Sequence, residues 1–162
     1  MEKKSYQFGD FLAQVDPSYK DFVAKIHEDL TQEGYKPKIE AKTSGLSVSY
    51  ANPKTKRNML NFLFRKNVPM VRLYADNFNK YADFLNVLPE AMEKEVGKAT
   101  KCSRLIDPSA CNPRCVGGYD LHIRGNHYQK CRMNCFQFEI NPDSIPVLAN
   151  FIENERKEAI TK

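Results

Sequence analysis

Residues 36–74 constrain the fold of this 162-residue chain more than any other segment. Leu46, Val48 and Tyr50 alternate with serines, and a period of two is typical of a strand with one buried face. Further short apolar runs follow, and the asparagine and proline residues between them indicate turns. The segment therefore predicts a four-stranded antiparallel meander. Its expected strands are 38–42, 46–50, 59–64 and 70–74.

Helical spacing replaces this alternation on both sides of the meander. Asp16 and Pro17 are typical of a helix start, apolar residues then recur every three or four positions, and Gly34 is typical of a helix end. These signals predict a helix over 17–33. The other expected elements are a short helix over 6–15, a helical region capped by Asp76, a helix over 89–96, a hairpin with Gly125-Asn126 as its turn, a strand over 136–140 and a C-terminal helix after Asp143 or Ser144.

This order of elements predicts the fold class. We expect one α+β domain over residues 1–162, with helices packed on a mainly antiparallel sheet that consists of the meander and a C-terminal hairpin. The loop at 98–118 is the candidate boundary between a helix-and-meander part at 1–97 and a cysteine-rich part at 98–162.

The hydropathy of the chain bears on its compartment. No apolar run approaches the roughly 18 residues that a membrane span needs, and residues 1–6 contain no apolar signal core. We therefore expect a cytoplasmic protein without a membrane partner. In a reducing cytosol, clustered cysteines are more often metal ligands, catalytic thiols or buried apolar residues than disulfides.

Five cysteines fall within residues 102–135, and four of them form two pairs with three intervening residues. Paired thiolates at this spacing can supply a tetrahedral zinc ion, which predicts a structural zinc site. Cys131 and Cys135 would lie about 13 Å apart in a continuous strand, so the site requires a turn at 132–134. The expected ligands are Cys111, Cys115, Cys131 and Cys135, with Cys102, His122 and His127 as spare ligands. Separate buried thiols, disulfides or one reactive thiol are the alternatives.

Residues 43–75 contain six Lys and Arg residues and no Asp or Glu, and the chain carries a net charge of +5. Such a segment can bind phosphate or another anion. Aromatic residues lie between the cations, as base stacking by a single-strand-binding sheet would require. Solvated turn charges and buried aromatic rings are the simpler interpretation, and a pI of 8.9 disfavours nucleic acid. The candidate anion-binding residues are Lys54, Lys56, Arg57, Arg65 and Arg72.

The sequence contains no phosphate-binding glycine loop, no G-x-S-x-G elbow and no H-E-x-x-H helix. The favoured function is therefore a non-enzymatic module with a structural zinc ion and a sheet that binds an anionic ligand or a protein partner. A thiol-dependent enzyme or redox sensor is one alternative. A nucleic-acid-binding domain that uses residues 43–75 is another.

Several short motifs recur in one known group of proteins. They are CNPRC at 111–115, GYD at 118–120, YQKCR at 128–132 and CFQF at 135–138. The chain resembles a group of bacterial proteins, mostly from Firmicutes, over its whole length, including NPKTKR at 52–57. That group has no assigned activity, so the resemblance implies a bacterial cytosolic source and no functional residues.

Overall fold

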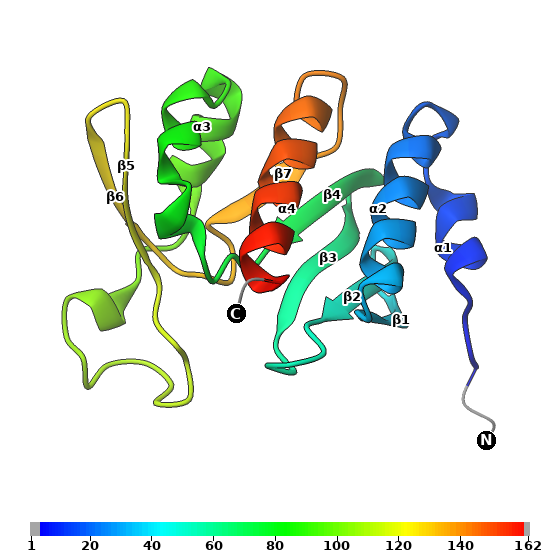
Figure 1. The fold of residues 1–162 in the computed structure, drawn as a ribbon, viewed down its shortest axis with the longest axis horizontal. Helices are drawn as coiled ribbons and strands as arrows, with labels where there is room; N and C mark the ends of the chain where they lie inside the picture. The colour runs from blue at the N-terminus through cyan, green and yellow to red at the C-terminus, as the bar shows by residue number, and fades with distance from the viewer. Residues whose placement is uncertain (1–3, 161–162) are drawn as a thin grey trace.

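The computed structural model describes residues 4–160 and confirms the α+β class. Its helices are α1 (Phe8–Gln14), α2 (Lys20–Gln32), α3 (Glu90–Lys98) and α4 (Ile145–Ile160), with 3-10 segments η1 (Pro17–Tyr19), η2 (Phe78–Lys80), η3 (Ala82–Val87) and η4 (Ser103–Leu105). Its strands are β1 (Lys36–Lys42), β2 (Gly45–Ala51), β3 (Asn58–Arg65), β4 (Val68–Leu73), β5 (Tyr119–Ile123), β6 (Asn126–Lys130) and β7 (Phe136–Glu139). Figure 1 shows α2 and α4 in front of the main sheet.

Five strands form an antiparallel sheet in the order β1-β2-β3-β4-β7, and β5 and β6 form a separate hairpin. The predicted four-stranded meander is confirmed. β7 pairs with β4, placing Phe136 opposite Leu73 and Gln137 opposite Arg72. The last third of the chain therefore completes the sheet that the first half begins.

The two faces of the sheet differ in burial, as the period of two predicts. Val48, Phe62 and Val71 lie opposite one another in register and are fully buried. The rings of Phe62 and Phe11 lie 6.0 Å apart, so α1 covers this face. On the other face, Asn61 lies opposite Arg72, and both are half-buried.

The helix predicted from Asp16 begins with a 3-10 turn and continues as α2. The Asp16 carboxylate accepts the Ser18 backbone N–H at 2.8 Å, which satisfies one donor at the helix start. Gly34 has a φ of +90°, a left-handed conformation that suits glycine after a helix. Val23 and Leu30 of α2 are fully buried on the core side.

Two local predictions are wrong. The helical region predicted after Asp76 is present as the 3-10 segments η2 and η3, but Asp76 does not cap it, because its carboxylate binds arginines instead. The hairpin turn is Arg124-Gly125, with Ile123 opposite Asn126. Both turn residues have positive φ, and such turns favour glycine in the second position, which Gly125 occupies.

Within residues 4–160, no helix is long and apolar enough to cross a membrane.

Candidate anion-binding pocket

The turn between β2 and β3 folds around one asparagine. The Asn52 side-chain oxygen accepts the backbone N–H of Lys54 at 2.8 Å and that of Thr55 at 3.2 Å. The Asn52 backbone closes the turn by accepting the N–H of Lys56 and donating to the carbonyl of Arg57, each at 2.8 Å. Asparagine is frequent in turns because it makes such bonds. The turn therefore presents three cations from four successive positions.

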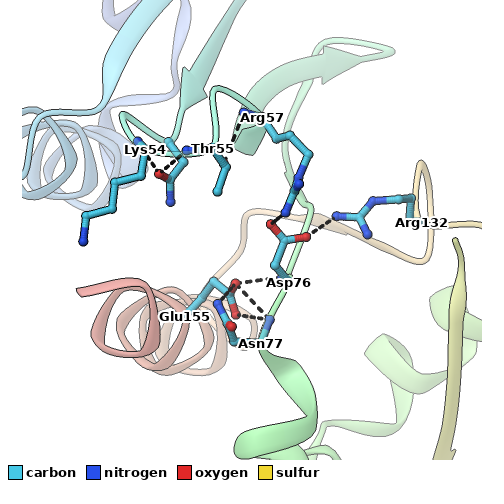
Figure 2. Close-up of polar contacts among 8 residues, drawn as sticks. Lys54, Thr55, Arg57, Asp76, Asn77, Arg132 and Glu155 are labelled. Carbon is cyan, nitrogen blue, oxygen red and sulfur yellow. Dashed lines mark hydrogen bonds and ion pairs between the residues drawn. The ribbon is translucent and has the colours of Figure 1, made fainter. Parts of the chain in front are cut away.

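Asp76, in the segment that follows β4, joins this turn to a distant segment. Arg57 donates to Asp76 Oδ2 at 2.9 Å and Arg132 donates to Oδ1 at 2.7 Å (Figure 2). Arg132 also lies over the ring of Tyr119, with its guanidinium carbon 5.4 Å from the ring centroid. Burial opposes ionisation of Asp76, but the two guanidiniums outweigh it and hold the pKa of this carboxyl below its ordinary value.

Glu155 of α4 is buried and receives four donors from the segment that follows β4. Its Oε1 accepts the backbone N–H of Asp76 at 2.7 Å, and the backbone and side-chain N–H of Asn77 at 3.2 and 3.0 Å (Figure 2). The Tyr81 hydroxyl donates to Oε2. Burial, together with the charge of Glu155, raises the pKa of Tyr81, so its hydroxyl stays a donor. Glu155 therefore fixes this segment against α4.

The β2–β3 turn, the segment after β4 and Glu155 line a pocket of about 230 Å³, which we call the turn pocket. Tyr35 forms part of its wall, and burial raises the pKa of this tyrosine to about 12, so its hydroxyl remains protonated at neutral pH. Asn77 also lines the pocket, and its Oδ1 is buried without a hydrogen-bond partner in the described part of the chain. The lining residues are Tyr35, Asn52, Lys54, Thr55, Arg57, Asn58, Met59, Asp76, Asn77, Glu155 and Ala159.

The charges at the turn pocket do not cancel. Lys54, Arg57 and Arg132 lie in or beside it, against the carboxylates of Asp76 and Glu155. Glu155 is 2% exposed and the Asp76 side chain is 26% exposed, whereas the Arg57 side chain is 48% exposed. The accessible side of the pocket is therefore cationic.

The structure divides the five predicted anion-binding residues among three places. Lys54, Lys56 and Arg57 lie together in the β2–β3 turn, and Arg65 ends β3 at the opposite end of that strand. Arg72 lies on the sheet face away from the helices and donates to Gln137 Oε1 at 2.8 Å.

The aromatic residues of the meander do not form a surface for base stacking. Tyr50 and Phe62 are fully buried, and Phe64 is 6% exposed, on the face that carries the helices. The simpler interpretation, in which these rings belong to the core, is confirmed.

The structure forms the turn on which the zinc prediction depends. The backbone N–H groups of Asn134 and Cys135 donate to the carbonyl of Cys131 at 3.2 and 3.0 Å, so the chain reverses at 132–134. Cys135 is fully buried in the core, however, and burial raises the pKa of its thiol. A thiol in this environment is disfavoured as a thiolate ligand.

The remaining cysteines are unpaired and differ in exposure. Cys111 is exposed, Cys115 is half-buried and accepts the Gly117 N–H at 3.4 Å, and Cys102 packs against Gly118. No three Cys, His, Asp or Glu side chains of residues 4–160 form a group that could hold a metal ion. His122 and His127 lie on the β5–β6 hairpin. Zinc binding therefore stays a prediction.

The sequence analysis did not identify three charged residues of the site, Asp76, Glu155 and Arg132, and of these Glu155 has a local signal. Glu155 lies at helical spacing from Leu148, Phe151 and Ile152, so an acid in an apolar stripe marks it as a buried carboxylate. Arg132 pairs with an acid 56 positions earlier, and nothing in its neighbourhood indicates this partner. Comparison with protein-family models, curated proteins and solved structures gives no match for this chain.

Proposed function

We propose that the protein is a non-enzymatic binding module that takes a small anion, such as a phosphate or carboxylate group, in the turn pocket. The observation that supports this most is the sharing of Asp76 by two guanidiniums. One carboxylate compensates only one of these charges. Because the Glu155 carboxylate also lines the pocket, the three cations Lys54, Arg57 and Arg132 exceed the two carboxylates by one positive charge, which stays available to a ligand.

The contacts of Arg57 explain how the anion would bind. One nitrogen of its guanidinium is held by Asp76, which positions the group, and the half-exposed side chain keeps further N–H donors. Arginine suits phosphate and carboxylate because its planar guanidinium can donate hydrogen bonds to two oxygens at once. A volume of about 230 Å³ lies below the usual range for pockets of drug-sized molecules, which favours a small ligand.

The proposal is tested by titrating inorganic phosphate into the protein at low ionic strength, with calorimetry as the readout. The wild type should bind phosphate, and Arg57→Gln should weaken binding by about tenfold or more, because one charge-assisted hydrogen-bond donor is lost. Arg65→Gln removes the same charge from the far end of the same strand and should change affinity by less than about twofold. Absence of phosphate binding, or equal losses in both variants, would overturn the proposal.

A further inference from the structure

A second, smaller pocket adjoins the turn pocket. Its volume is about 110 Å³, and we call it the side pocket. Glu33 and Pro53 line the side pocket but not the turn pocket. The two pockets have four lining residues in common, which are Tyr35, Asn52, Lys54 and Ala159. A ligand larger than a bare anion can therefore occupy both.

Helix α4 lines both pockets with one face. Ala159 follows Glu155 by four positions, so the two side chains lie on the same side of the helix, one turn apart. Glu155 belongs to the turn pocket, whereas Ala159 belongs to both. The lining that α4 provides thus changes from a carboxylate to a methyl group over one helical turn.

The side pocket is lined mainly by apolar groups. Tyr35 contributes a buried aromatic ring, Ala159 a methyl group and Pro53 a pyrrolidine ring. Gly34, at the end of α2, lies so close to Pro53 that a Cβ atom there would contact the proline Cγ at 3.6 Å. The proline ring is therefore supported by the end of α2, which holds this wall of the side pocket in place.

Glu33, the acidic residue of the side pocket, is already paired. Its two oxygens accept from Arg156 of α4, Oε2 from Nε at 3.0 Å and Oε1 from Nη2. An apolar group in the side pocket consequently meets no uncompensated negative charge among the described lining residues. A second anionic group is not required there either, because Arg156 is compensated by the same contact.

Adjoining charged and apolar pockets suit an anion that carries an apolar group. We infer that the ligand is a small organic oxyanion, an aryl or alkyl phosphate or carboxylate, whose apolar group lies between Tyr35, Pro53 and Ala159. A cavity of about 150 Å³ can hold benzene, so about 110 Å³ suits a ring that stays partly open to solvent. This inference rests on the proposed function, since the anionic group lies in the turn pocket.

The experiment compares inorganic phosphate with phenyl phosphate by calorimetry at low ionic strength. The wild type should bind phenyl phosphate about tenfold more tightly, which corresponds to burial of roughly 50 Å² of apolar ring surface. Ala159→Leu places a larger side chain in the side pocket and should bring the ratio of the two affinities close to one. Acetate and benzoate, compared in the same way, distinguish a carboxylate from a phosphate as the anionic group.

The matched control is Ala149→Leu, which makes the same change at an exposed position of α4 outside both pockets and should keep the tenfold ratio. Leucine is a good helix former, so both variants should fold. In the unaltered protein, the ring protons of bound phenyl phosphate should show NOEs to the Ala159 methyl group.

The outcomes separate the inference from the proposed function. If none of the four anions binds, the proposed function fails and the inference fails with it. If phosphate binds but phenyl phosphate is not preferred, the inference alone is overturned. The same holds if Ala159→Leu weakens both ligands by the same factor or keeps the tenfold ratio, or if the NOEs to Ala159 are absent.

Discussion

Replacing Glu155 with alanine should destabilise the fold more than any surface substitution. The change removes the acceptor of four donors: the backbone N–H groups of Asp76 and Asn77, the Asn77 amide and the Tyr81 hydroxyl. The two backbone groups belong to the segment that follows β4 and cannot rotate toward other acceptors. A buried donor without a partner costs about 1–3 kcal/mol.

The expected loss in the free energy of unfolding is about 3–5 kcal/mol for Glu155→Ala, because some of the four donors gain water in the space that the side chain leaves. Glu155→Gln should cost only about 1 kcal/mol. Its amide oxygen replaces Oε1 as the acceptor for Asp76 and Asn77, and the Tyr81 hydroxyl can rotate to accept from the new amide. The difference in free energy of unfolding between Glu155→Ala and Glu155→Gln therefore reports the contribution of the hydrogen bonds separately from that of the charge.

Urea unfolding, followed by circular dichroism, gives each free energy by linear extrapolation. Glu153→Ala is the matched control, since Glu153 lies on the same helix, is 57% exposed and pairs only at the surface with Lys157 at 3.1 Å. That variant should change stability by less than about 0.5 kcal/mol. If Glu155→Ala and Glu155→Gln cost the same, or if both cost less than about 1 kcal/mol, Glu155 does not anchor the segment.

Two further predictions concern a pH dependence and the cysteines. Because its folded-state pKa is lowered, Asp76 stabilises the protein above its unfolded-state pKa of about 3.9, and this contribution disappears as the pH falls through the folded-state pKa. Asp76→Asn should therefore cost about 1–2 kcal/mol in urea unfolding at pH 7 and progressively less below about pH 4; a constant difference down to pH 2 would contradict this. In folded, reduced protein, iodoacetamide should modify exposed Cys111 first and buried Cys135 last, as mass spectrometry of peptides can show, and rapid modification of Cys135 would contradict its burial.

The meander was predictable because its signals are local. The alternation from Leu46 to Tyr50 reports which side chains face the core, and it requires no knowledge of the rest of the chain. The pairing of β7 with β4 was not predictable in this way. Its two strands are more than 60 residues apart, and their apolar pattern fits several neighbours equally well.

The hairpin shows how a small local error changes which side chains face each other. A turn at Gly125-Asn126 would pair His122 with Gln129, whereas the turn at Arg124-Gly125 pairs it with His127. Two side chains explain why the structure takes the second register. Gly125 occupies the turn position that favours glycine, and the Asn126 amide donates to Glu93 Oε1 of α3 at 3.0 Å. The second of these is a tertiary contact, which the hairpin sequence does not contain.

The candidate sites follow the same division between local and distant information. Lys54 and Arg57 were identifiable from charge alone, since the β2–β3 turn forms from its own residues. Their relation to a ligand depends on Asp76 and Arg132, which reach the pocket from the end of β4 and from the turn after β6. A cationic segment thus indicates where an anion can bind. How much of that charge remains for the anion depends on the carboxylates of Asp76 and Glu155, which offset two of the three cations Lys54, Arg57 and Arg132 and leave one positive charge to the ligand.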